Sequence, residues 1–195
     1  MTVTTGIVLF DDAEELDWAG PWEVFTMART EGDQVVTIAE HDRPVRCAKG
    51  LRVLPDHTFH DAPTLDVVVV PGGQGTRREV DNQVLLDWLA KTAATCRWVT
   101  SVCTGSFVLL AAGPAQGKRV TTHWGSIDRL RDSGDVTVLE GVRYVRDGDV
   151  VTAAGVSAGI DMALWLVGQL YDVDHARAVQ RFMEYDPAPP YSADV

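Results

Sequence analysis

The residue best placed for chemistry in this chain is Cys103, which directly follows the apolar, β-type run 98–102. Small residues at 104–106 come next, and then the helix-forming stretch 107–110. This order predicts a strand, a sharp turn and a helix, with the cysteine where free backbone N–H groups and the helix dipole favour a thiolate. A thiolate is a nucleophile, and amides at such a turn can bind an oxyanion. The alternative is a buried structural cysteine at a strand end.

Glycines and polar residues elsewhere could complete such a site. Gly72 and Gly73 follow the valine run 67–70, and glycines there let backbone amides approach a ligand or supply a turn with positive φ. The Thr104 hydroxyl could contact a substrate or cap the helix that follows it. His123 could pair with the thiol, or close a hydrogen-bond network at the start of the next helix. Asp17, taken by position alone, is predicted to be a helix N-cap or turn residue.

Composition narrows the class of protein. The chain has 195 residues, 46% of them hydrophobic, which suits a single globular domain over 1–195. Lys plus Arg is 17 and Asp plus Glu is 28, so the formal net charge of −11, with no basic cluster, argues against nucleic acid and anionic membranes as partners. Three unpaired cysteines, no zinc-type spacing, no signal peptide and no membrane-length apolar run predict a cytoplasmic protein without a metal.

Strand and helix signals alternate along the chain. We expect strands at 6–10, 34–39, 67–70, 98–102, 136–139, 142–146 and 150–152, with a hairpin within 45–53. Helices are expected at 21–29, 82–95, 107–112, 122–131, 157–171 and 173–185, the first with Pro21 in its first turn, and the tail 186–190 is expected to be extended. Alternation with apolar central strands predicts a doubly wound α/β sandwich with a mostly parallel sheet. Functional groups in such folds gather at the carboxyl ends of the strands.

Three motifs together resemble the DJ-1/PfpI superfamily, whose fold is flavodoxin-like and related to class I glutamine amidotransferases. They are Val70-Pro71-Gly72-Gly73, Ser101-Val102-Cys103-Thr104-Gly105 and Thr121-Thr122-His123-Trp124. Further stretches at 16–21, 101–106, 116–119, 156–161 and 184–190 resemble the isocyanide hydratases within that superfamily. The resemblance runs nearly end to end, and it extends to the effector-side domain of AraC-type regulators.

The resemblance implies a catalytic pair, with Cys103 as nucleophile and Asp17 as the acid facing it. Such an acid is expected to be driven toward its protonated form by burial and by the thiolate. The resemblance implies that Gly72, Gly73 and Thr104 bind substrate or developing negative charge. His123 is expected to lie behind these residues and to hold them in position without contacting the substrate. PfpI-type proteases carry a histidine directly after the nucleophile, and this chain has Thr104 there.

The implied activity is cysteine-dependent hydration of a small neutral isocyanide to an N-substituted formamide through a covalent thioimidate, with no cofactor and in a homodimer. Two alternatives stay open: a DJ-1-like redox-sensing protein, and a glyoxalase-like thiol enzyme. Peroxide oxidises a low-pKa, exposed thiol, so the first alternative depends on the environment of Cys103.

Overall fold

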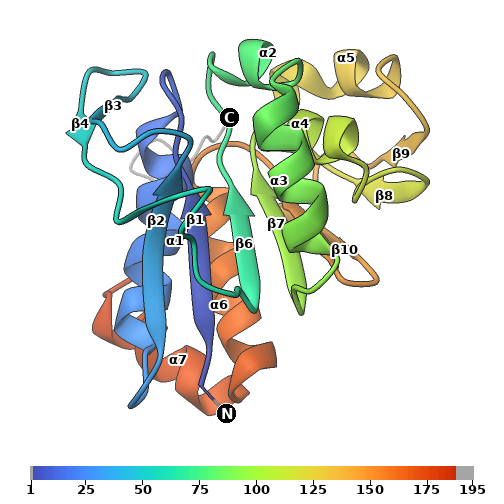
Figure 1. The fold of residues 1–195 in the computed structure, drawn as a ribbon. Helices are drawn as coiled ribbons and strands as arrows, with labels where there is room; N and C mark the ends of the chain where they lie inside the picture. The colour runs from blue at the N-terminus through green and yellow to red at the C-terminus, as the bar shows by residue number, and fades with distance from the viewer. Residues whose placement is uncertain (1, 188–195) are drawn as a thin grey trace.

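The computed structural model describes residues 2–187 as a seven-stranded sheet covered by helices on both faces (Figure 1). The strand order is β10-β11-β7-β6-β1-β2-β5, and only the β10–β11 pair is antiparallel. The strands of this sheet are β1 (Thr4–Val8), β2 (Gln34–Ala39), β5 (His57–Thr58), β6 (Val67–Val70), β7 (Trp98–Val102), β10 (Tyr144–Asp147) and β11 (Val150–Ala153). The prediction of a doubly wound, mostly parallel α/β sandwich is therefore confirmed.

Helices pack against the sheet in two layers. The helices are α1 (Glu15–Ala28), α2 (Thr76–Glu79), α3 (Gln83–Ala93), α4 (Gly105–Ala112), α5 (Ile127–Arg131), α6 (Ala158–Leu170) and α7 (Val173–Phe182). Helix α1 packs on α6, and α6 on α7, along one face, while α3 and α4 pack together on the other (Figure 1). Small two-stranded sheets, β3 (Val45–Arg46) with β4 (Arg52–Val53) and β8 (Lys118–Val120) with β9 (Val136–Val138), flank this sandwich.

The buried core runs through the central strands. All four residues of β6 and all five of β7 are buried, as parallel strands covered on both faces require. Asn82 caps α3, because its side chain accepts hydrogen bonds from the amides of Val84 and Leu85. The expected hairpin within 45–53 is present as β3–β4. These elements bring the carboxyl ends of β1, β6 and β7 to one edge of the sheet.

Some predicted boundaries are wrong. Helix α1 begins at Glu15 and contains Pro21 in its interior, whereas the sequence predicted a helix that begins at Pro21. Acidic Glu15 and Asp17 lie in the first turn, where their charges interact favourably with the helix dipole. This interaction favours a helix that starts before Pro21. The helix predicted over 122–131 is a 3₁₀ turn, η1 (Trp124–Ser126), followed by α5. The last helix ends at Phe182, three residues early, and part of the predicted tail, 188–190, lies outside the described residues.

Within residues 2–187, no helix is both long enough and apolar enough to cross a membrane. The same residues contain no cluster of three or more His, Cys, Asp or Glu side chains arranged to hold a metal ion.

Candidate active site

Cys103 occupies a strained turn between β7 and α4. Its φ of 57° lies in the left-handed region, which a residue with a side chain adopts only where the surroundings impose it. The Cys103 amide donates to the carbonyls of Ala153 and Ala154 at 3.1 and 2.9 Å. The Cys103 carbonyl accepts from Thr122 Oγ1 at 2.8 Å and from Ser106 Oγ at 3.2 Å. Hydrogen bonds to both of its peptide groups therefore hold the predicted elbow in place.

Asp17 lies in the first turn of α1 and is fully buried. Its Oδ2 accepts a hydrogen bond from the Gly72 amide at 2.9 Å, while Oδ1 has no hydrogen-bond partner among the described residues. Asp17 is not the N-cap, because the capping position is Glu14, whose side chain makes no capping bond. The alternative prediction of a capping role for Asp17 is therefore wrong.

Gly72 brings the carboxylate and the thiol together because it has no side chain. A Cβ at this position would lie 2.8 Å from Asp17 Oδ2, 2.8 Å from Cys103 Cβ and 2.5 Å from the amide nitrogen of Thr104. Real Cβ atoms do not approach heavy atoms so closely, so only glycine fits here. The structure thus places four of the predicted site residues, Asp17, Gly72, Cys103 and Thr104, around one point.

Burial dominates the electrostatics of this pair. It raises the pKa of Asp17 to about 7, with a further increase from the charge of Glu14, although the Gly72 amide opposes the shift. Burial also raises the pKa of the Cys103 thiol to about 12, with the Asp17 carboxylate adding to the shift. The Thr104 amide, which hydrogen-bonds to the sulfur, lowers the thiol pKa by less. The prediction of a raised Asp17 pKa agrees with the structure, whereas burial and the charge of Asp17 act against the thiolate that the turn was predicted to favour.

Gly73 and Thr104 form a contact of their own beside the thiol. Gly73 has a φ of 115°, so the predicted positive-φ turn is present. Its amide donates to Thr104 Oγ1 at 3.0 Å, and Thr76 Oγ1 donates to the same oxygen at 3.1 Å. The Thr104 side chain does not cap α4. The Gly73 amide therefore reaches an incoming anion only if the Thr104 hydroxyl moves aside.

His123 lies behind the elbow and makes no hydrogen bond to Cys103 in the part of the chain that the structure describes. Its Nδ1 accepts from the Gly125 amide at 3.1 Å, and its ring packs so tightly on Gly155 that a Cβ there would lie 2.5 Å from His123 Cδ2. A supporting position is consistent with this geometry, and a thiol–imidazole pair is not formed.

Two threonines of the site were missed by the sequence reasoning. Thr122 holds the Cys103 carbonyl, and Thr76 holds the Thr104 hydroxyl. Thr122 lies in the Thr121–Trp124 motif that carried part of the resemblance, so that motif was the available signal. Thr76 carries no such signal, because nothing in the sequence shows that the first residue of α2 meets the residue that precedes α4.

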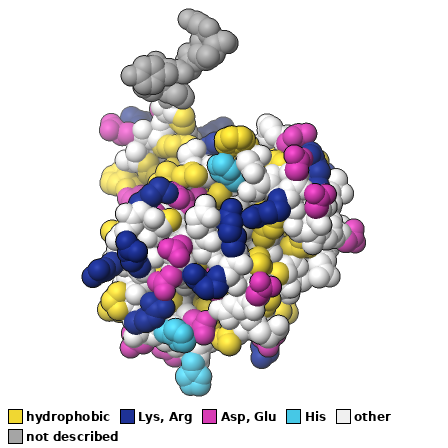
Figure 2. All heavy atoms as spheres, turned by 90° about the horizontal axis from the view of Figure 1, so that it is seen from above, with side chains coloured by type: hydrophobic (Ala, Val, Ile, Leu, Met, Phe, Trp, Pro, Cys, Tyr) yellow, Lys and Arg dark blue, Asp and Glu magenta, His cyan; other side chains and the backbone are white. Residues whose placement is uncertain are grey.

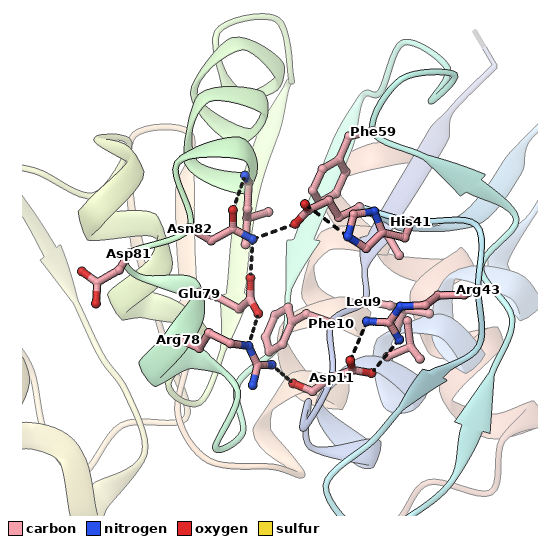
Figure 3. A pocket seen from close by; sticks show the side chains of 14 residues that line it. Leu9, Phe10, Asp11, His41, Arg43, Phe59, Arg78, Glu79, Asp81 and Asn82 are labelled. Atoms are coloured by element: carbon pink, nitrogen blue, oxygen red, sulfur yellow. Dashed lines mark hydrogen bonds and ion pairs between the residues drawn. The ribbon is translucent and has the colours of Figure 1, made fainter.

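A separate cavity of about 470 Å³ lies over the carboxyl ends of β1 and β2 (Figure 3). Its polar side chains pair with one another: Asn82 Nδ2 donates to Glu40 and to Glu79 at 2.8 Å each. The Arg43 guanidinium donates a hydrogen bond to the Asp11 carboxylate at 2.7 Å. Cys103 and Asp17 do not line this cavity, so it is distinct from the thiol site.

Comparison with known proteins agrees with this geometry, since the model of the DJ-1/PfpI family matches residues 4–169. The chain belongs to the DJ-1/PfpI family. It is 44% identical over 193 residues to an isonitrile hydratase of Pseudomonas putida, a match that covers 99% of this chain and 83% of that protein.

Two further relatives show how widely the family fold is used. A glutathione-independent glyoxalase of Caenorhabditis elegans is 30% identical and covers 82% of this chain and 84% of its own length. The crystal structure of a ThiJ/PfpI family protein from Pseudomonas syringae superposes with a TM-score of 0.92 at 33% identity, covering 100% of this chain and 80% of that one. The resemblance stated from the three motifs is therefore confirmed.

Proposed function

We propose that this protein hydrates isocyanides, R–N≡C, to N-substituted formamides, R–NH–CHO. The observation that carries the proposal is the buried pair of Asp17 and Cys103 beside the glycine turn, in a chain 44% identical to an isonitrile hydratase. An isocyanide is neutral and its terminal carbon accepts a nucleophile, so a dry site with one thiol and one carboxyl group suits it.

The first step joins the thiol to the substrate. Above a pH of about 7 the pair holds one proton, because the pKa of Asp17 is about 7 and that of Cys103 about 12. The Cys103 sulfur attacks the isocyanide carbon while its proton passes to Asp17, and Asp17 then delivers this proton to the same carbon. The product is a thioimidate, R–N=CH–S–Cys103. The Thr104 amide, which faces the sulfur, stabilises charge that develops there.

The second step releases the formamide. Water adds to the thioimidate carbon, with Asp17 as the base that takes a proton from the water, and that proton passes to the nitrogen. The tetrahedral adduct R–NH–CH(OH)–S–Cys103 then breaks its carbon–sulfur bond. The hydroxyl proton returns through Asp17 to sulfur, so the net reaction adds one water molecule to the substrate and restores the enzyme.

The thiol's surroundings favour this function over redox sensing. A sensor cysteine has a low pKa and is open to solvent, because peroxide reacts with an exposed thiolate. Cys103 is 7% exposed and its thiol pKa is raised. A glyoxalase-like activity would use the same nucleophile, so substrate choice separates it from the hydratase.

The deciding experiment measures formamide production from 4-nitrophenyl isocyanide by the wild-type protein, Cys103→Ala and the control Cys96→Ala. Cys96 lies outside the site, so we expect many turnovers from wild type and Cys96→Ala and none from folded Cys103→Ala. Methylglyoxal is offered in parallel. Turnover of methylglyoxal alone, or of the isocyanide by Cys103→Ala, contradicts the proposal.

We also propose that the protein acts as a homodimer in the cytoplasm, where reducing conditions keep the Cys103 thiol free. Large apolar side chains are exposed at Leu16, Leu51 and Trp124, the last of them 83% exposed, and such residues favour association. Light scattering after gel filtration tests the dimer, and a monomer mass at micromolar concentration contradicts it.

A further inference from the structure

The Thr104 hydroxyl, on the residue that directly follows the nucleophile, does not cap the helix that begins after it. Thr104 is 6% exposed, and Thr76, the first residue of α2, is 1% exposed. Figure 2 looks onto the end of the molecule that carries α2 in Figure 1, and charged side chains of both signs lie on that face. Both hydroxyls are buried, so protein groups rather than bulk water decide where their hydrogens point.

Hydrogen bonds of different lengths connect the two threonines with Gly73. The Gly73 amide donates to Thr104 Oγ1 at 3.0 Å, and the Thr76 hydroxyl donates to the Gly73 carbonyl at 2.8 Å. Both distances are usual for their kind of donor. A hydroxyl has one hydrogen, so the contact from Thr76 Oγ1 to Thr104 Oγ1, at 3.1 Å, is the weaker of the two that Thr76 can make. The hydrogen of Thr76 therefore serves mainly the Gly73 carbonyl.

The hydrogen of Thr104 has no oxygen acceptor at a usual distance among residues 2–187. The Gly73 carbonyl lies 3.2 Å from Thr104 Oγ1, and Thr76 Oγ1 lies 3.1 Å from it. Both distances exceed the usual range of about 2.5–3.0 Å for an O–H donor and an oxygen acceptor. The Gly73 carbonyl also has the shorter bond from Thr76. A buried hydroxyl hydrogen held this weakly can turn to a stronger acceptor.

The Cys103 sulfur becomes such an acceptor when it carries negative charge. Thr104 lies beside the thiol, because a Cβ at Gly72 would lie 2.5 Å from the Thr104 amide nitrogen and 2.8 Å from Cys103 Cβ. The Thr104 side chain lowers the pKa of the Cys103 thiol, as a donor to the sulfur does, although burial dominates that pKa. A hydrogen bond to a charged acceptor is about twice as strong as one between neutral groups.

We propose that Thr76 is a positioning residue, which occupies the Gly73 carbonyl and so leaves the Thr104 hydroxyl free to donate to the Cys103 sulfur. This inference rests on the proposed function and adds a residue to its mechanism. Negative charge develops on the sulfur twice, when it attacks the isocyanide carbon and when the carbon–sulfur bond of the adduct breaks. At both points the Thr104 hydroxyl keeps its proton and stabilises the charge through a hydrogen bond.

Removing the Thr76 hydroxyl should redirect the hydroxyl of Thr104. The Gly73 carbonyl would lose its short bond from Thr76, and it would draw the Thr104 hydroxyl to itself because an unpaired buried acceptor is costly. The sulfur would then lose a donor although Thr104 itself is unchanged. A role of Thr76 in packing alone has no such effect on the sulfur.

The test compares Thr76→Val, which removes the hydroxyl and keeps the shape of the side chain, with Thr76→Ser, which keeps the hydroxyl. With 4-nitrophenyl isocyanide we expect Thr76→Val to lower kcat by about tenfold with KM unchanged, a smaller loss than the roughly 10²–10³ for deleting an oxyanion donor. Thr76→Ser should keep the wild-type kcat. So should the control Thr100→Val, which removes another buried hydroxyl that donates to a backbone carbonyl, at 2.9 Å.

A double variant separates positioning from a structural role. When Thr76 acts through the Thr104 hydroxyl, its replacement has no further effect once that hydroxyl is gone. We therefore expect Thr76→Val combined with Thr104→Val to have the kcat of Thr104→Val alone. Losses that multiply in the double variant, or a wild-type kcat in Thr76→Val, overturn the proposal. Thr76→Ala lacks the same hydroxyl and takes the place of a Thr76→Val protein that does not fold.

Alkylation by iodoacetamide tests the same relationship without an isocyanide. The reagent reacts with the thiolate, and mass spectrometry follows the Cys103 peptide separately from those of Cys47 and Cys96. We expect Thr76→Val to slow alkylation of Cys103 by about fivefold, and to have no further effect in Thr104→Val. Equal rates in wild type and Thr76→Val overturn the proposal. Absence of isocyanide turnover by folded wild type removes the proposed function, and the alkylation rates then decide the role of Thr76 alone.

Discussion

The fully buried Asp17 carboxylate accepts a hydrogen bond from the Gly72 amide at 2.9 Å through Oδ2, while its Oδ1 has no hydrogen-bond partner among residues 2–187. A buried carboxylate with a single donor is costly to ionise. The protein therefore keeps at Asp17 a group whose charged form destabilises the fold and whose protonated form is populated near neutral pH.

Replacing Asp17 with Asn should separate stability from activity. Because the Asp17 pKa is raised from 3.8 to about 7 in the folded state, the ionised group destabilises the fold above pH 4, fully so above pH 7. This penalty is at most roughly 4 kcal/mol. We expect Asp17→Asn to unfold at a higher temperature than wild type at pH 8, with the difference disappearing near pH 4. Its kcat should fall by about 10²–10⁴ because Asn cannot transfer the proton.

Asp33 provides the matched control for that change. It accepts hydrogen bonds from the amides of Val3 and Thr30 and from the Tyr171 hydroxyl, and these bonds lower its pKa. Asp33→Asn should therefore destabilise the protein above pH 4 and leave kcat unchanged. Thermal unfolding across pH 4–8 measures both variants, and a Tm for Asp17→Asn below that of wild type at pH 8 contradicts the argument.

The pH dependence of catalysis should report Asp17. Only its carboxylate form can take the Cys103 proton, so kcat/KM is expected to rise with pH and level off above about 7. No thiolate limb should be visible below pH 10, because the thiol pKa is raised to about 12. Thiolate absorbance at 240 nm, taken as wild type minus Cys103→Ala, checks this independently. A thiolate signal at pH 7 would contradict this prediction, because it would show that the proton shared by Asp17 and Cys103 lies on Asp17.

Adding a methyl group at Gly72 should disrupt the site. Its Cβ would meet the Thr104 amide at 2.5 Å, a backbone atom that cannot turn away. We expect Gly72→Ala to cost about 1–3 kcal/mol in unfolding free energy and to remove activity. Gly168→Ala in α6 is the control, since its Cβ would meet only ordinary contacts with α7, at 3.8 and 3.9 Å. Urea unfolding and turnover measure both, and an active Gly72→Ala would show that the turn can move.

Local patterns in the sequence predicted the elbow well, and the electrostatics poorly. The run 98–102 followed by Cys103 and small residues placed the nucleophile correctly, because strand and helix signals depend on neighbouring residues. The direction of the thiol pKa depends on how deeply the site is buried and on the charge of Asp17, which is 86 positions away in the chain. Helix dipole arguments hold for exposed termini, and burial outweighed them here.

The dependence on residues far away in the chain also explains why the role of Thr76 and the start of α1 were not predicted. Thr76 at the start of α2 contacts Thr104, which is 28 positions away in the chain, and no periodicity in the sequence predicts that contact. Pro21 predicted a helix start, yet α1 begins six residues earlier. Its first turn carries acidic residues, and buried residues lie on both sides of the proline. Motifs located the strand ends, and tertiary packing decided which side chains meet there.

Thr122 should be needed for the shape of the elbow. Its hydroxyl donates to the Cys103 carbonyl at 2.8 Å and helps to hold the left-handed turn. Thr100 on β7, the strand that leads to Cys103, makes a matched bond to the Val68 carbonyl at 2.9 Å, and both threonines are buried. Thr122→Val and Thr100→Val should each cost about 1–3 kcal/mol in stability. Only Thr122→Val should lower kcat. The expected decrease is about tenfold, which corresponds to a loss of about 1.4 kcal/mol of transition-state stabilisation. Equal kcat in the two variants, measured with 4-nitrophenyl isocyanide, would show that Ser106 and the Cys103 amide bonds hold the turn without Thr122.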